Sequence, residues 1–466
     1  MERANIIIVG GGITGLTAAY YLQQQINEQN LPYNVKLIEA SDRLGGKIHT
    51  VKKDGFTIER GADSFLARKK PAVDLVEHLG MSDELVRNDT GQSFVLVDKK
   101  LHKIPQGSFM GVPTRVGPFV FSSLISPLGK LRAGLDYVIP KGEPQEDQSL
   151  GGFFRRRFGN ELVENLLEPL LSGIYSGDVD EMSLMATFPN FYEIEQKYGS
   201  LIKGLKQTMP EKKRGTGRRP GQFFSFKNGF ESLVDRLSEQ LGKDVVDLNT
   251  AVDHIEKKEH GYHLLLSNGK VYKADVVVMA TPHRTLPKIF SQYDFFKVLD
   301  EMPVTSVANV ALAFDESAIK KDMDGTGFVV SRNSDFRITA CTWTHRKWPL
   351  TTPEGKVLLR AYVGKPSDQE VVNFSDEEIT DIVLRDLNKI MKISEQPQFT
   401  VVTRWKEMMP QYTVGHKKRI ATVKRGVSEH LPGVFLAGSS YEGVGVPDCI
   451  RQSEQVVEDV FNYLQR

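Results

Sequence analysis

Short runs of consecutive apolar residues recur at three distant places in the chain. They lie at 6–9, 276–279 and 434–437, and a glycine or proline follows each run closely. Runs of this length between turn residues are typical of strands buried on both faces of a parallel sheet. Apolar residues at helical spacing recur at 230–241. The pattern therefore predicts an α/β protein whose central sheet combines strands from distant parts of the chain.

A second group of strand-like runs lies between these segments. Its members are found at 307–314, 327–330, 338–343 and 357–363. Such a series of short strands predicts an antiparallel sheet. Residues 262–274 predict a separate hairpin that turns at Asn268-Gly269, a pair typical of a type I′ turn. Helical spacing is predicted from about Leu150 to Leu171.

The first apolar run ends in a Gly-x-Gly-x-x-Gly pattern formed by Gly10, Gly12 and Gly15. In such a pattern the first glycine permits a tight turn, the second admits a pyrophosphate, and the third lets the helix pack on the strand. Glu39 follows the next strand, where a carboxylate can accept hydrogen bonds from ribose hydroxyls. Close packing alone could explain the glycines. The strand, the helix and Glu39 together favour a dinucleotide site.

These patterns suggest a division of the chain into three parts. We expect a Rossmann-like dinucleotide-binding domain made of the discontinuous segments 1–68, 222–292 and 425–466. An inserted α+β substrate domain with an antiparallel sheet is expected at 69–110 and 293–424. A helical cap is expected at 111–221.

Composition narrows the class of protein. The chain has 466 residues, with 40% hydrophobic and 26% charged residues. A net charge of +1 argues against nucleic acid as a partner. Two cysteines without a Cys/His cluster argue against disulfides and metal sites. The early first strand and the lack of an apolar run near ~18 residues lead us to expect a cytoplasmic protein without a signal peptide.

Two further segments favour FAD as the dinucleotide. Gly45-Gly46, between Arg43 and Lys47, offers bare backbone and positive charge to a ribityl pyrophosphate. The segment 438–447 is rich in glycine and ends at Pro447, a residue suited to the first turn of a helix. The N-terminus of that helix could stabilise the negative charge of a reduced flavin. A plain glycine turn and a strand–loop–helix without ligand are the alternatives.

Several motifs resemble those of the flavin amine oxidase superfamily, and within it most closely the protoporphyrinogen and coproporphyrinogen oxidases of haem synthesis. The resemblance covers nearly the whole chain and is nearest to the soluble Gram-positive type. The motifs that carry it are at 9–16, 59–65, 168–178, 309–312, 405–416 and 443–450. Ser172-Gly173-Ile174-Tyr175 and Pro410-Gln411-Tyr412 are more discriminating than the glycine fingerprint.

The resemblance implies specific contacts. With the fingerprint, the FAD contacts implied are Gly10, Gly11, Gly12, Ile13, Thr14, Gly15, Glu39, Ala40, Arg43, Lys47, Gly61, Ala62, Asp63, Ser64, Val252, Trp405, Val444, Gly445 and Val446. Gly173, Ile174 and Tyr362 are the candidates for lining a tetrapyrrole cavity. The arginine that plant and animal members pair with a propionate is not evident, since its region reads Gly-Ser-Phe-Met-Gly at 107–111.

The reaction implied is the six-electron oxidation of coproporphyrinogen III, with protoporphyrinogen IX as a second substrate. Each of three steps would pass a hydride from a bridge carbon to the flavin, and oxygen would be reduced to hydrogen peroxide. A transient contact with the next enzyme of haem synthesis is a further expectation. An amine oxidase, a carotenoid desaturase or a non-catalytic chaperone of prenylated GTPases remain alternatives.

No side chain stands out as a catalytic base. The single histidines His49, His102, His283 and His416 are expected to be structural or exposed. Candidates to meet substrate carboxylates are Lys69, Lys70, Arg60 and Arg451, although an ordinary solvated surface position is favoured for each.

Two further stretches have alternative readings. The apolar stretch 104–140 is expected to roof the cavity, the alternative being peripheral membrane contact. The basic stretch 212–219 is expected to be a solvated loop.

Replacing Glu39 with alanine tests the ribose contact. We expect Glu39→Ala to weaken FAD binding by about 1–3 kcal/mol, because the ribose hydroxyls lose a charged acceptor. Titration of the apoprotein with FAD measures this change. Unchanged affinity would show that Glu39 does not contact the ribose.

Overall fold

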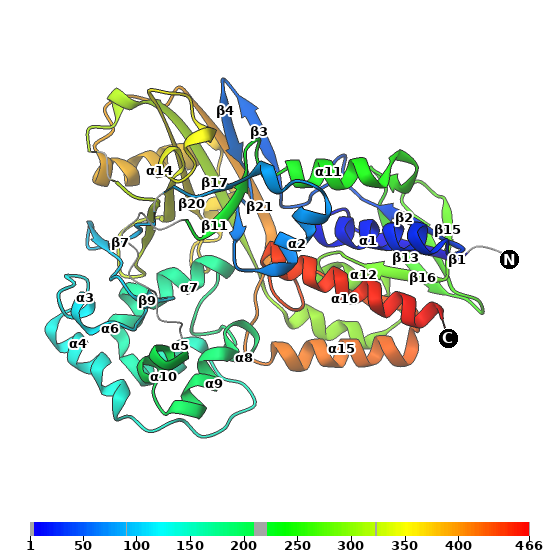
Figure 1. Cartoon of the computed structure of the whole chain (residues 1–466), viewed down its shortest axis with the longest axis horizontal. Helices are drawn as coiled ribbons and strands as arrows, with labels where there is room; N and C mark the ends of the chain where they lie inside the picture. The colour runs from blue at the N-terminus through cyan, green and yellow to red at the C-terminus, as the bar shows by residue number, and fades with distance from the viewer. Residues whose placement is uncertain (1–3, 90, 209–220, 322–323, 466) are drawn as a thin grey trace.

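A computed structural model describes residues 4–89, 91–208, 221–321 and 324–465. The basic stretch predicted as a loop at 212–219 lies outside these residues. A parallel sheet with its helices occupies one end of the molecule, and a larger sheet and a helical region occupy the other end (Figure 1). Both chain termini lie at the parallel-sheet end. The expected fold class, mixed α/β with an antiparallel sheet and helices, is confirmed.

The parallel sheet has five strands and brings together the three apolar runs. Its order is β12 (Val246–Asp247), β2 (Tyr33–Ile38), β1 (Ala4–Val9), β16 (Val276–Met279) and β22 (Val434–Leu436). Every neighbouring pair is parallel. The carboxyl ends of strands that are far apart in the chain thus lie together at one end of the sheet, where ligands of open α/β sheets bind.

Helices and a small sheet cover the two faces of this parallel sheet. Ile6 and Ile8 of β1 pack toward α1 (Ile13–Gln29), α11 (Ser232–Leu241) and α16 (Val446–Leu464). Ile7 and Val9 pack into a second core. That core includes β13 (Val252–Lys257), β14 (Tyr262–Leu266), α12 (Leu286–Ile289) and α15 (His416–His430). A hairpin joins β14 to β15 (Val271–Ala274) at the predicted position, but only Gly269 has a positive φ, +80°, and Asn268 does not, so the turn is not of type I′.

The larger sheet has seven strands. Its order is β21 (Phe399–Pro410), β17 (Val304–Asp315), β20 (Lys356–Val363), β19 (Ile338–Trp343), β18 (Gly327–Val330), β7 (Phe94–Val97) and β8 (Lys100–Lys103). All neighbours are antiparallel except β18 and β7. Helix α14 (Asp376–Met391) packs on this sheet and begins with a capping box formed by Ser375 and Glu378. The antiparallel sheet predicted from 307–363 is therefore confirmed and extended.

The third region is helical. It contains α3 (Val116–Val120), α4 (Pro127–Gly134), α5 (Leu150–Phe158), α6 (Asn160–Leu162), α7 (Glu168–Tyr175), α8 (Leu184–Thr187), α9 (Pro189–Tyr198) and α10 (Leu201–Thr208). A π-helical segment, Val163–Leu167, joins α6 to α7. Pro169 has no N–H to donate into the preceding turn, which interrupts the regular helical ladder there.

Smaller elements connect these parts. The strands are β3 (Thr50–Lys53), β4 (Phe56–Glu59), β5 (Phe65–Leu66), β6 (Leu85–Arg87), β9 (Ser108–Phe109), β10 (Val112–Pro113) and β11 (Phe223–Phe226). The remaining α-helices are α2 (Lys70–His78) and α13 (Thr344–Lys347). The 3₁₀ segments are Ser82–Glu84, Leu135–Tyr137, Lys243–Val245, His283–Thr285, Asp294–Glu301, Glu316–Ala318, Pro349–Thr351 and Glu370–Asn373.

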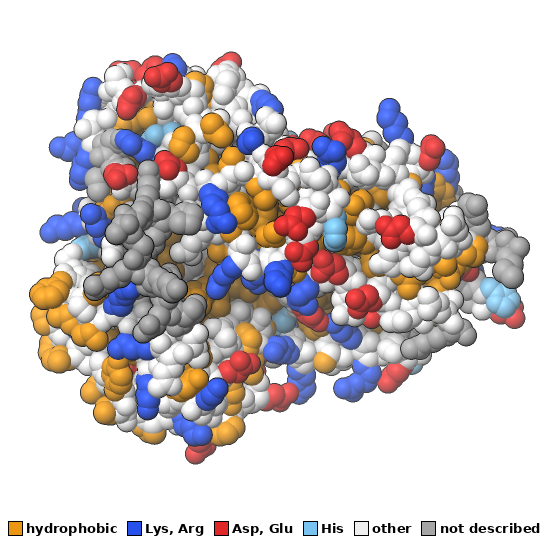
Figure 2. All heavy atoms as spheres, in the orientation of Figure 1, with side chains coloured by type: hydrophobic (Ala, Val, Ile, Leu, Met, Phe, Trp, Pro, Cys, Tyr) orange, Lys and Arg blue, Asp and Glu red, His pale blue; other side chains and the backbone are white. Residues whose placement is uncertain are grey.

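The outer face of the helical region carries an apolar patch, visible at the left edge of Figure 2. We define it by its exposed side chains, which are Val116, Val120, Phe121, Leu128, Leu131, Leu135, Tyr137 and Val138. The ring of Phe121 is 90% exposed. Within the described ranges, none of the helices is long and apolar enough to cross a bilayer.

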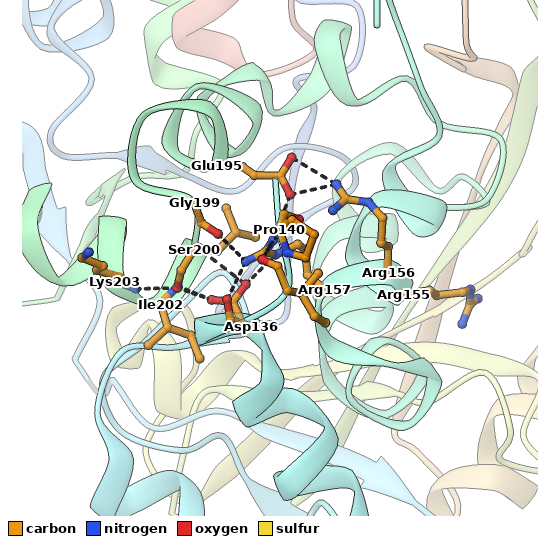
Figure 3. A network of polar contacts seen from close by, with 12 residues as sticks. Asp136, Pro140, Arg155, Arg156, Arg157, Glu195, Gly199, Ser200, Ile202 and Lys203 are labelled. Carbon is orange, nitrogen blue, oxygen red and sulfur yellow. Dashed lines mark hydrogen bonds and ion pairs between the residues drawn. The ribbon is translucent and has the colours of Figure 1, made fainter. Parts of the chain in front are cut away.

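A buried ionic network holds the helical region together (Figure 3). Arg157, Asp136 and Glu195 are all fully buried. The Arg157 guanidinium pairs with Asp136 at 2.6 Å and Glu195 at 3.2 Å, and it donates to the backbone oxygen of Gly199. Asp136 also accepts from the backbone N–H of Ile202. Every charge in this network therefore has a partner of opposite sign.

Removing the central cation should be costly. We expect Arg157→Met to lower the free energy of unfolding by about 3–5 kcal/mol, because the buried Asp136 carboxylate loses its counter-charge and Glu195 loses one of its two cations. Arg156→Met is the matched control, since Arg156 is 34% exposed and Glu195 keeps Arg157 when Arg156 is lost. Its cost should be about 1 kcal/mol or less. Urea unfolding followed by circular dichroism measures both, and equal costs would contradict the role of burial.

Candidate functional site

One large cavity lies between the two sheets and helix α7. Its volume is about 1140 Å³. This exceeds the ~300–1,000 Å³ typical of a pocket for one drug-sized molecule. The cavity is lined at one end by the carboxyl ends of the parallel strands and at the other by α7, β18, β19 and β20. It therefore has room for a dinucleotide and a second molecule.

The glycine turn after β1 forms part of the dinucleotide end. Gly10 has φ +109°, and a Cβ there would lie 2.7 Å from the Ala280 oxygen. A Cβ on Gly15 would lie 1.9 Å from the Gly10 oxygen, so only glycine lets α1 approach β1 this closely. Gly12 lines the cavity with nothing within 4 Å of its Cβ position. Bare backbone thus faces the space that a pyrophosphate needs, at the start of a helix.

Glu39 stands at the carboxyl end of β2 and lines the same cavity as Ile13, Thr14 and Ala40. Its carboxylate accepts from the Gly11 N–H at 2.6 Å and from the Ser41 N–H at 2.8 Å. These donors fix the orientation of the carboxylate beside the turn. Gly11 and Gly15 belong to the turn but lie outside the cavity lining.

The two cations around Gly45-Gly46 have different positions. Lys47 lines the cavity and donates to the Met408 oxygen at 3.0 Å and to the Ser439 hydroxyl at 3.3 Å. Burial lowers the pKa of Lys47. Arg43 does not line the cavity. It donates to the Gly46 and Ile48 oxygens and pairs with Glu231, so it braces the loop.

The segment after β4 is also divided between the cavity and the interior. Gly61 and Ala62 line the cavity. Asp63 turns away and pairs with Lys347 at 3.1 Å and Arg360 at 2.7 Å, and the Ser64 hydroxyl donates to it. Although burial alone would raise the pKa of Asp63, these two cations hold it well below its usual range. The structure therefore gives Asp63 and Ser64 an internal ionic contact.

Side chains from three strands hold this segment against the larger sheet. The Glu59 oxygen accepts from Asn309 of β17 at 3.2 Å and from Arg360 of β20 at 3.0 Å. The Arg60 oxygen accepts from Trp405 of β21 at 2.8 Å. Trp405 also lines the cavity. These bonds fix the dinucleotide end relative to the other end.

The C-terminal segment completes the dinucleotide end, with Val252 of β13 also in the lining. Val444 and Val446 line the cavity, and Gly445 is the N-cap residue of α16. Pro447 lies in the first turn, as predicted. The N-terminal turn of this helix also brings Cys449 into the lining. The partial positive charge of the helix N-terminus is thus directed at the cavity.

The far end of the cavity contains all three predicted substrate residues. Gly173 and Ile174 of α7 and Tyr362 of β20 line it. Apolar side chains including Val329, Phe336 and Ile338 share that lining. The charged residues Glu168, Asp178, Arg332 and Lys365 also line this end and were not predicted as site residues. Arg332 and Lys365 belong to no recognisable sequence motif, so nothing in the sequence pointed to them. Glu168 and Asp178 do lie within the 168–178 motif, which could have indicated them.

An acidic cluster surrounds Arg332. The guanidinium pairs with Glu168 at 2.6 Å, Asp178 at 2.6 Å and Asp180 at 3.0 Å. Arg155 pairs with Asp180 at 2.9 Å from the other side. Burial, together with Asp178 and Asp180, raises the pKa of Glu168 to about 7, although Arg332 opposes this. The charge of Arg332 is therefore fully balanced by neighbouring carboxylates.

The other expected cations are mostly outside the cavity. Of the four, only Arg60 lines it, and its Nε donates to Thr403. Lys69 pairs with Asp448 and Arg451 pairs with Glu442, both outside the cavity lining. Lys70 also lies outside that lining.

The histidines do not form a metal or acid–base cluster. His283 and His416 are buried, and their Nε2 atoms lie within hydrogen-bonding distance of the Met302 and Tyr441 oxygens. Burial lowers the pKa of His283, and it lowers that of His416 to about 4. No group of His, Cys, Asp and Glu suited to a metal ion occurs in the described part of the chain.

The apolar stretch 104–140 does not roof the cavity, so that prediction was wrong. None of its residues contributes to the lining. Its large side chains instead divide between the core of the helical region and the exposed apolar patch. The hydrophobic pattern could not distinguish an inner roof from an outer surface, because both expose apolar side chains on one face.

Comparisons with known proteins agree with this architecture. Residues 13–461 match the sequence profile of the flavin containing amine oxidoreductases. The chain is 51% identical to the coproporphyrinogen III oxidase of Bacillus subtilis over 99% of both chains. It is 45% identical to that of Staphylococcus aureus over 98% of both chains.

A crystal structure from Exiguobacterium sp. 255-15, provisionally named a protoporphyrinogen oxidase, superposes with a TM-score of 0.89. It shares 39% identity with this chain and both chains are fully covered. The whole chain therefore has the fold of this solved structure. The chain belongs to the flavin containing amine oxidoreductase family.

Proposed function

We propose that the cavity binds FAD with its adenosine at Glu39 and its ring system near the N-terminus of α16. Three features of the residues fit this group. Gly12 leaves open space where a side chain would stand. Lys47 is partly buried and, within the described chain, hydrogen-bonds only to uncharged oxygens, so it offers a positive charge to an electron-rich ligand. Glu39 lies at the end of β2, where ribose hydroxyls bind in such folds.

We further propose that the chain is a porphyrinogen oxidase of haem biosynthesis that acts on coproporphyrinogen III and also on protoporphyrinogen IX. The observation that carries this proposal is the single cavity, which continues from the FAD end into an apolar chamber beside α7. Full-length similarity to proteins named coproporphyrinogen III oxidases supports the same choice.

The chain's own residues bind and orient the reactants. The flavin supplies hydride acceptance when bound, and the protein places a bridge carbon of the substrate beside it. Gly173 and Ile174 give α7 a flat surface against which a macrocycle can lie. The apolar lining excludes water, while Tyr362 and Asn309 line the same space with polar groups. The helix N-terminus of α16 stabilises negative charge that develops at its end of the cavity.

Some expectations remain proposals. Oxygen is proposed as the electron acceptor, with hydrogen peroxide as its product. The three-part domain division at 1–68, 222–292 and 425–466, at 69–110 and 293–424, and at 111–221 is retained as proposed. A cytoplasmic location, peripheral membrane contact and a transient contact with the next enzyme also stay predictions.

Gly12→Val tests the FAD site. We expect the variant to fold but to lose FAD, because the valine would occupy the approach of the pyrophosphate while touching no protein atom near its Cβ. Gly134→Val is the matched control, since that Cβ position is equally open and lies on α4, outside the cavity. Flavin absorbance released on denaturation measures retention. A yellow Gly12→Val protein would contradict the assignment.

The substrate proposal is tested with the purified, FAD-loaded protein. We expect porphyrin fluorescence to develop from coproporphyrinogen III far faster than autoxidation, with three molecules of hydrogen peroxide per porphyrin. Polyamines and phytoene should give no peroxide. Fluorescence at the autoxidation rate from both porphyrinogens, together with turnover of an amine, would replace this proposal with the amine oxidase alternative.

A further inference from the structure

The cavity is lined by four cations whose surroundings differ. Arg332 is surrounded by three carboxylates. Lys47 and Arg60 donate to uncharged oxygens and lie beside the proposed FAD. The fourth is Lys365, whose ammonium has no hydrogen bond or ion pair within the described residues. It is therefore the cation at the substrate end that is left to meet a ligand.

The backbone around Lys365 is fixed. Gly364 follows β20 with φ +100°, and a Cβ there would lie 2.5 Å from the Ser306 oxygen. The Lys365 oxygen accepts from the Asp368 N–H and from the Gln369 amide, both at 2.8 Å. A tight turn thus holds Lys365 in place at the end of β20, while its side chain ends in a free charge.

Neighbouring carboxylates do not neutralise this charge directly. Asp368 is the acid nearest in sequence, and Arg337 holds both of its oxygens at 2.8 and 2.9 Å. Arg337, and to a smaller extent Lys365, lower the pKa of Asp368, so the negative charge of Asp368 is already largely taken up by Arg337. The Lys365 ammonium can therefore accept an anionic partner from the cavity.

The acidic cluster around Arg332 lies at the same end of the larger sheet as Lys365. Strands β18 and β20 both pair antiparallel with β19, so they run in the same direction, and their carboxyl ends are about 10 Å apart. Arg332 follows β18 and is paired with three carboxylates, and Lys365 follows β20. A ligand carboxylate therefore meets a cation that is already balanced at the first position and an unpaired cation at the second. The substrate end thus has a charge polarity.

We propose that Lys365 pairs with a propionate of the tetrapyrrole and thereby favours the substrate that carries propionates on more of its rings. Each of the four rings of coproporphyrinogen III carries a propionate, so every orientation presents one to Lys365, whereas protoporphyrinogen IX has propionates on two neighbouring rings only. The pairing therefore favours coproporphyrinogen. The inference rests on the proposed function. It assigns to Lys365 the anchoring role that the sequence region 107–111 does not supply.

The test uses FAD-loaded protein and two stable porphyrins, coproporphyrin III and protoporphyrin IX, titrated by fluorescence. Lys365→Met keeps the length of the side chain and removes its charge. We expect this variant to bind coproporphyrin about tenfold more weakly or worse, and protoporphyrin within about twofold of the unmodified protein. The KM for coproporphyrinogen should rise with kcat little changed, because the pairing is equal in the bound and reacting states.

Two variants serve as controls. Lys365→Arg should keep most of the affinity, since it keeps the charge, and Lys288→Met should change nothing, since Lys288 is exposed on α12 outside the cavity. Unchanged coproporphyrin binding by Lys365→Met would overturn the proposal, as would an equal loss for both porphyrins or a failure of Lys365→Arg to retain affinity. If the unmodified protein binds neither porphyrin and oxidises neither porphyrinogen, the proposed function itself fails and Lys365 has no propionate to pair with.

Discussion

The carbonyl oxygens of Glu59 and Arg60 fix the geometry of the whole site. They accept hydrogen bonds from Asn309, Arg360 and Trp405, on three neighbouring strands of the larger sheet. One residue further, a Cβ on Gly61 would lie 1.8 Å from the Lys47 oxygen, so this segment is also pressed against the dinucleotide end. A dinucleotide and a second molecule can react only if their two binding ends hold a constant separation. This short segment provides that constraint, because it contacts both ends at once.

Much of the fold was predictable because its determinants are local. The apolar runs at 6–9, 276–279 and 434–437 became neighbouring strands, and Asn268-Gly269 became a hairpin turn. Each of these signals depends on a period or a turn preference within about ten residues. Gly15 follows the same logic, since the Gly10 oxygen five residues earlier leaves no room for a side chain there. The Pro447 helix start is likewise a local preference.

The site was less predictable because its polar contacts join residues far apart. The partner of Asp63, Arg360, lies 297 residues away. Nothing near Asp63 in the sequence distinguishes a cofactor contact from an internal ion pair. Arg43 likewise turns toward carbonyls of its own loop and toward Glu231. Lys365 follows an ordinary strand, and only the folded sheet places it two strands from the acidic cluster. Packing likewise decides which side of a helix faces solvent, so the exposure of the apolar patch could not be predicted from the sequence of 104–140.

The degree of charge compensation separates structural groups from ligand-binding groups in this molecule. Arg157 and Arg360 are buried, and each is matched by carboxylates and backbone oxygens, as a buried charge must be to avoid a large desolvation cost. Lys47 is only partly enclosed and contacts only uncharged oxygens among the described residues, and desolvation lowers its pKa. Such a charge costs stability unless a ligand completes its surroundings. Both Lys47 and Lys365 line the cavity, one at each end, whereas Arg157 and Arg360 do not. The unbalanced charges therefore support the positions proposed for the anionic and electron-rich ligand groups, and they do so independently of any sequence motif.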